Sequence, residues 1–93
     1  MFIVAAEICL MLYESNTLKE KRQVIKSIIN RIKSRFNVSI AEVDFLDSWK
    51  RAQLGIACVS NDKAHANSVI TSVINFLEKD FRFEITDIQV RIE

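Results

Sequence analysis

The sequence predicts an α+β domain over residues 1–93 with the element order βαββαβ. Two stretches are almost continuously apolar and rich in β-branched side chains, which is typical of strands at the centre of a sheet. Two others repeat apolar residues at helical spacing. Two βαβ halves with right-handed crossovers then give a four-stranded antiparallel sheet, in the order 4-1-3-2, with both helices on one face.

The four strands are expected at Phe2–Leu12, Val38–Phe45, Arg51–Ser60 and Phe83–Ile92. The first and third are the apolar runs, as central strands should be. The second and fourth carry most of the charged strand residues, as edge strands should. In the last strand the apolar parity switches after Ile85, which predicts a β-bulge near Thr86 and Asp87.

The first helix is expected from Leu18 to Phe36. Thr17 and Glu20 have the spacing of a capping box, and Asn37 is a plausible stop because Asn tolerates the left-handed conformation. The apolar stripe of this helix consists of Ile25, Ile28, Ile29, Ile32 and Phe36.

The second helix is expected at about residues 62–80, with its N-cap within Ser60-Asn61-Asp62. Its apolar stripe consists of Ala66, Val69, Ile70, Val73 and Leu77.

Charge is strongly segregated along the chain. Residues 18–36 hold seven of the thirteen basic side chains and one of the twelve acids, so that this segment carries about +6 and the remainder about −5. On a helix, four of these cations fall into one stripe beside the apolar face. They are Lys19, Arg22, Lys26 and Lys33. Such a stripe fits the phosphates of RNA, or alternatively an acidic protein surface.

A second group of chemically active residues lies in the expected hairpin at residues 42–51. Trp49 offers a stacking platform and Arg51 an anion contact. Glu42, Asp44 and Asp47 are paired carboxylates that could serve acid–base chemistry or hold a divalent ion. The structural alternative is an ordinary hairpin, with Trp49 packed over the sheet end and Asp47 capping the turn.

Composition argues against several classes of protein. One glycine excludes the clamp of KH domains, and two cysteines cannot hold an iron–sulfur cluster or a four-thiolate metal site. Strand three lacks the aromatic residues on which RNA-recognition modules stack bases. We therefore expect no cofactor, no resident metal and no catalytic residue. With no membrane span or secretory leader in the sequence, we expect a cytoplasmic protein with two reduced thiols.

Two helices cover only one face of such a sheet. Ile3, Ala5, Cys9 and Met11 fall on the opposite face, which is therefore also apolar. Apolar surfaces of this kind usually mark interfaces. The sequence predicts a homodimer formed through the open sheet face.

Four segments together resemble the YlxP-like family of small bacterial proteins. They are Ser15-Asn16-Thr17-Leu18-Lys19-Glu20-Lys21-Arg22, Arg35 to Asp44, Trp49-Lys50-Arg51-Ala52 and Leu54 to Asp62. The resemblance implies a ferredoxin-like βαββαβ fold, a tendency to dimerise and no established activity. It also implies a role near RNA or ribosomes, because the family's genes often lie among those for translation initiation and ribosome maturation.

The same resemblance singles out a polar cluster. Its members are Lys21, Glu42, Asp44 and Asp47. The chain departs from the family at Phe45, where the family often has His, and this departure weakens an enzymatic interpretation.

Three functional hypotheses follow. The first is a non-enzymatic module that binds RNA or a ribonucleoprotein through the basic helix, with Trp49 and Arg51 as secondary contacts. The second is a homodimeric adaptor whose basic helix docks an acidic protein surface. The third is an enzyme that uses Glu42, Asp44 and Asp47.

Overall fold

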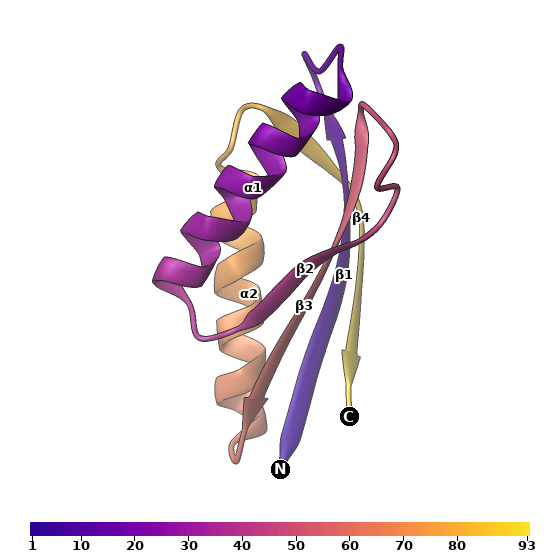
Figure 1. The fold of residues 1–93 in the computed structure, drawn as a ribbon. Helices are drawn as coiled ribbons and strands as arrows, with labels where there is room; N and C mark the ends of the chain where they lie inside the picture. The colour runs from indigo at the N-terminus through magenta and orange to yellow at the C-terminus, as the bar shows by residue number, and fades with distance from the viewer.

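The computed structural model describes all 93 residues and confirms the predicted architecture. One antiparallel sheet has the strand order β2-β3-β1-β4, and two helices lie on one of its faces (Figure 1). This is the ferredoxin-like arrangement. The elements are β1 (Phe2–Leu12), α1 (Leu18–Arg35), β2 (Ser39–Asp44), β3 (Arg51–Ser60), α2 (Lys63–Glu78) and β4 (Phe83–Ile92).

Strict alternation along β1 separates the two faces of the sheet. Even-numbered residues such as Val4 and Ile8 are fully buried beneath the helices, whereas the odd-numbered residues between them are half-buried on the open face. A single core of 18 buried residues joins the covered face to both helices. The predicted assignment of Ile3, Ala5, Cys9 and Met11 to the uncovered face is confirmed.

The predicted capping box opens α1. Thr17 Oγ1 accepts a hydrogen bond from the Glu20 amide at 3.1 Å, and the Glu20 carboxylate accepts one from the Asn16 amide at 2.8 Å. The predicted stop at Asn37 is wrong. The helix ends at Arg35, because Phe36 is already extended with φ −128° while its N–H still bonds to Ile32.

Asp62 is the N-cap of α2, and its carboxylate accepts hydrogen bonds from the amides of Ala64 and His65. The helix buries Ala66, Ile70, Val73 and Leu77, and Val69 packs beside them. The second apolar stripe was therefore predicted correctly.

The bulge in β4 is also confirmed. Cys9 pairs with Asp87 and Leu10 pairs with Ile85, so that Thr86 is the extra residue. Because of this extra residue, the apolar side chains that follow it (Ile88, Val90 and Ile92) lie on the same covered face of the sheet as Ile85.

The two cysteines are not neighbours, although they lie on adjacent strands. Cys9 is opposite Gln53 on the open face, whereas Cys58 is opposite Val4 and is buried under the helices. Their opposite parity therefore places the thiols on different faces of the sheet. Neither helix is long and apolar enough to cross a membrane.

Candidate functional site

Lys21 is the most unusual residue of α1, because it is fully buried. Its ammonium donates hydrogen bonds to the backbone oxygens of Phe45 at 2.9 Å and Leu46 at 3.4 Å, and it forms an ion pair with Glu42 of β2. A buried lysine of this kind requires such partners, since an unpaired buried charge is very costly. Lys21 therefore fixes the β2–β3 loop against the first turns of α1.

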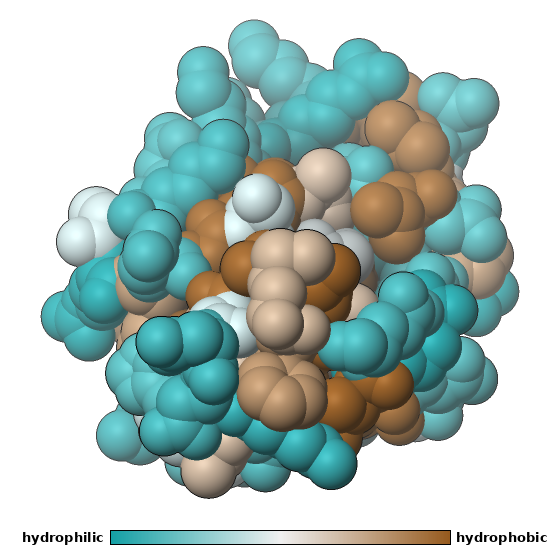
Figure 2. Space-filling view, turned by 90° about the horizontal axis from the view of Figure 1, so that it is seen from below, coloured by the Kyte–Doolittle hydropathy of each residue, from teal (hydrophilic) through white to brown (hydrophobic).

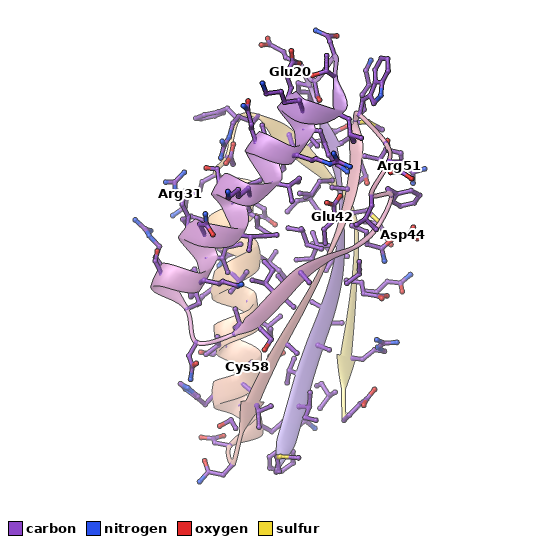
Figure 3. The ribbon with its side chains drawn as sticks, viewed as in Figure 1. Glu20, Arg31, Glu42, Asp44, Arg51 and Cys58 are labelled. Atoms are coloured by element: carbon purple, nitrogen blue, oxygen red, sulfur yellow. The ribbon has the colours of Figure 1, made fainter.

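The Glu42 carboxylate lies on the covered face of the sheet, where it pairs with the Lys21 ammonium. Its Oε2 atom lies 2.5 Å from the ammonium, but it has no hydrogen bond of good geometry. The contact is therefore best described as a charge pair, while the two loop carbonyls satisfy the donors of Lys21. Figure 3 shows Glu42 directed from β2 toward α1.

The loop that Lys21 holds contains the only non-glycine residue with positive φ. Phe45 has φ 59°, and its amide donates a hydrogen bond to Asp44 Oδ1 at 2.7 Å. The Arg51 guanidinium lies 4.0 Å from the centre of the Phe45 ring. A bulky residue in the left-handed region is strained, and such strain concentrates at functional sites.

The structure brings together only half of the predicted polar cluster of Lys21, Glu42, Asp44 and Asp47. A register shift between Glu42 and Asp44 places Asp44 opposite Gln53, on the other face from Glu42. Asp47 is exposed in the loop and makes no ion pair. The three carboxylates form no group that could hold a metal ion.

The basic stripe of α1 (Lys19, Arg22, Lys26 and Lys33) is exposed throughout. The chain contains two ion pairs, Lys21–Glu42 and Arg82–Asp80, and neither involves the stripe. The acids of the edge strands therefore do not neutralise these cations within one copy of the chain.

Arg31 and Arg35 occupy the other flank of α1 and face α2. Their guanidinium carbons lie 5.4 and 5.1 Å from the centre of the Phe76 ring, which also makes an edge contact with Phe36. Figure 3 shows Arg31 on the side of α1 away from Arg51. The basic stripe thus points away from α2, toward the β2 edge of the molecule.

A hollow of about 460 Å³ lies next to these two arginines, at the end of α2. There the Arg82 guanidinium binds both oxygens of Asp80, at distances between 2.7 and 3.2 Å. These hydrogen bonds hold the pKa of Asp80 below its ordinary value, with a further contribution from the charge of Arg31. A larger hollow of about 740 Å³ lies beside it, between the start of α1 and residues 81–82.

Trp49 and Arg51 both lie at the end of the β2–β3 loop. Trp49 is 56% exposed, so it does not pack over the sheet end as the structural alternative required. Because Lys21 binds the same loop, Trp49 and Arg51 belong to the same end of the molecule as Lys19 and Arg22. Arg51 is the strand partner of Met11, so its side chain leaves the open face of the sheet, whereas the stripe lies on the helix side.

Sequence reasoning missed the burial of Lys21, although a signal was present. Lys21 precedes Ile25, Ile28 and Ile32 by four, seven and eleven residues, which is the spacing of the apolar stripe itself. A cation in such a position must be either at the end of the buried face or paired inside it.

Comparison with known proteins identifies relatives of most of the chain. A family model described as "Protein of unknown function (DUF503)" matches residues 3–90. The chain is 38% identical over 73 residues to "Uncharacterized protein YlxP" of Bacillus subtilis (strain 168), which covers 78% of this chain and 79% of that protein.

Two designed proteins share the fold. One, described as "De novo designed protein Foldit4", has a TM-score of 0.56 and 17% identity over 100% of this chain and 97% of its own. The other, a de novo design "with ferredoxin fold", has a TM-score of 0.56 and 15% identity over 100% of this chain and 84% of its own. At this level of identity, the likeness concerns the fold alone.

Proposed function

The chain belongs to the family described as "Protein of unknown function (DUF503)", and from this premise we propose that it is a non-enzymatic module that binds RNA, free or within a ribonucleoprotein, through the basic stripe of α1. The observation that carries the proposal is that the four exposed cations have no acidic partner in the chain. A row of unpaired cations attracts a polyanion and releases its counterions on contact.

The dimensions of the stripe suit several consecutive phosphates. From Lys19 to Lys33 the helix axis advances by about 21 Å. The buried face of α1 is docked on the sheet, so the stripe is held in place rather than free to rotate. A fixed row of cations loses less conformational freedom on binding than a flexible basic tail.

The β2–β3 loop supplies the second kind of contact. Trp49 is exposed in the loop that Lys21 of α1 binds, and it offers an indole face on which an unpaired base can stack. Stacking of this kind tolerates any base, but the base must not be paired within a duplex. We therefore propose that single-stranded RNA is preferred over duplex.

Fluorescence anisotropy with short single-stranded and duplex RNAs, titrated with salt, tests the proposal. We expect affinity in the micromolar range, and a slope of log K against log[salt] of about −3 if four phosphates are engaged. Lys26→Glu should weaken binding and reduce the slope by about 1. Trp49→Ala should weaken binding to single strands and leave the slope unchanged.

Lys63→Glu is the matched control, because Lys63 is an exposed cation of α2 and its replacement changes the net charge equally. Equal losses from Lys26→Glu and Lys63→Glu would show that only net charge matters. No binding at about 50 mM salt would overturn the proposal.

An acidic protein surface would also fit the basic stripe, which is the adaptor hypothesis. A complex that forms in the cell, survives nuclease treatment and is lost in Lys26→Glu would replace the RNA proposal by that one.

A further inference from the structure

The outer edge of β4 is open. The amide of Ile3 bonds to the carbonyl of Glu93 at 2.8 Å, and the amide of Glu93 bonds to the carbonyl of Ile3 at 2.7 Å. Hydrogen-bonded pairs alternate along antiparallel strands, so the odd-numbered residues of β4 beyond the bulge bond to β1. The even-numbered residues Ile88, Val90 and Ile92 direct their N–H and C=O groups outward, and no element covers this edge (Figure 1).

The side chains of the same three residues are also uncovered. They pair with Ile8, Ala6 and Val4, and therefore lie on the helix side of the sheet. Yet Ile88, Val90 and Ile92 are 37%, 46% and 47% exposed, because α2 lies over β1 and β3 rather than over β4. A long edge strand with a row of exposed β-branched side chains is a template for pairing with another strand.

The exposed apolar surface continues around the end of the sheet. Figure 2 views the molecule from below and shows apolar side chains gathered there among polar ones. β1 begins at this end, and β3 and β4 finish there. The exposed apolar residues of these strand ends are Met1, Phe2, Val59 and Ile92.

We propose that two copies of the chain pair antiparallel through β4, centred on Gln89, to form one continuous eight-stranded sheet. In this register Ile88 is opposite Val90 of the second copy, and both residues have outward backbone groups to exchange. Asp87 is opposite Arg91 of the second copy, and the two-fold axis repeats each of these pairs.

Charge selects this register over its neighbours. A pairing centred on Ile88 places Asp87 opposite Gln89, so Asp87 and Arg91 no longer face each other. A pairing centred on Val90 places Asp87 opposite Glu93, which are like charges. Only the register centred on Gln89 makes β4 complementary to itself in both charge and apolar pattern.

This dimer differs from the one predicted through the open sheet face, which it leaves uncovered. Its strand order is 2-3-1-4-4-1-3-2, and strands lie about 4.8 Å apart, so the two β2 strands are separated by about 34 Å. Because α1 packs beside β2, the two basic stripes lie at opposite ends of the sheet.

Exchanging charges in β4 tests the register without touching the core, since Asp87 and Arg91 are both exposed. Sedimentation of the full chain over a concentration series should show a dimer. Asp87→Arg and Arg91→Asp should each raise its dissociation constant at least about tenfold. The double variant, which exchanges both charges, should restore it.

An equal mixture of the two single variants should also dimerise. One chain then carries arginine at both positions and the other carries aspartate at both, so every facing pair joins opposite charges. Val90→Pro removes an outward N–H that β1 does not use, and it should leave a folded monomer by circular dichroism. Ala57→Arg, on the open face, is the control and should leave the dimer intact.

Two results would overturn the proposal. One is a wild-type chain that stays monomeric across the whole concentration series. The other is a dimer abolished by Ala57→Arg but unaffected by the β4 charge variants, which would place the interface on the open face instead.

Discussion

The ammonium of Lys21 and the carboxylate of Glu42 meet at 2.5 Å, with the lysine side chain 0% and the glutamate side chain 14% exposed. This pair joins α1 to β2, and the loop carbonyls bound by Lys21 add the β2–β3 connection to the same point. Helix, edge strand and loop are therefore positioned together, and with them the basic stripe and Trp49.

Replacing Lys21 by Met should lower the free energy of unfolding by about 3 kcal/mol. The variant leaves the Glu42 carboxylate without its counterion and two loop carbonyls without a donor. Urea unfolding followed by circular dichroism measures the change. The double variant Lys21→Met/Glu42→Leu should regain part of the loss, because it removes the unpaired charge.

The matched control is Lys19→Met, two residues earlier on the exposed side of α1, which should stay within about 0.5 kcal/mol of the wild type. Equal unfolding midpoints for Lys21→Met and Lys19→Met would contradict the structural role given to Lys21.

The left-handed conformation of Phe45 predicts an inverted order of two small substitutions. Alanine is normally more stable than glycine at a given site by about 0.5–1 kcal/mol. At φ 59° we expect Phe45→Gly to be more stable than Phe45→Ala by about 1 kcal/mol, since both delete the ring and only Ala keeps a strained Cβ. Thermal unfolding compares them.

The neighbouring Leu46 provides the reference for this comparison, because its φ is not positive. There alanine should be more stable than glycine. The same order at both positions would show that the backbone at Phe45 relaxes without cost.

The fold was predictable from sequence because its signals are redundant. The two apolar runs, the helical stripes, the Thr17–Glu20 box and the parity switch after Ile85 each indicate the same topology. The one local error at the end of α1 came from assigning the helix stop to Asn37. The extended Phe36 ends the helix first and also packs against the core.

The candidate site was less predictable, because its geometry depends on contacts between distant segments. The exposure of the basic stripe follows from helical periodicity, and it was predicted. The burial of Lys21 depends on loop carbonyls 24 and 25 residues away. The separation of Glu42 from Asp44 depends on a register shift that leaves no pattern in the strand sequence.

The close approach of one side chain, Val43, explains why position 55 of β3 is a glycine. A Cβ at this position would lie 2.8 Å from Val43 Cγ1, a β-branched side chain with little freedom to move. Gly55→Ala should therefore destabilise the wild type by about 1 kcal/mol. In a Val43→Ala background the clash disappears, and the same substitution should instead stabilise by about 0.5 kcal/mol, because it restricts the unfolded chain. Urea unfolding of the wild type, the two single variants and the double variant forms a double-mutant cycle. If Gly55→Ala had the same effect with valine and with alanine at position 43, the close approach would be contradicted.

The pairing of Asp80 with Arg82 predicts a specific dependence of stability on pH. The hydrogen bonds from Arg82 hold the pKa of Asp80 below its ordinary value, so the unfolded chain binds more protons than the folded one in acid. The stabilisation is thus fully present above the unfolded pKa of about 3.9 and is lost as the pH falls through the lower folded pKa.

Asp80→Asn should cost up to about 1 kcal/mol at neutral pH, and this difference should shrink progressively below about pH 4. Urea unfolding over a pH series measures it, with Asp47→Asn as the control, since Asp47 is exposed and has no ion pair within the chain. A difference between wild type and Asp80→Asn that stays constant down to the most acidic pH would show that the charge of Asp80 does not contribute.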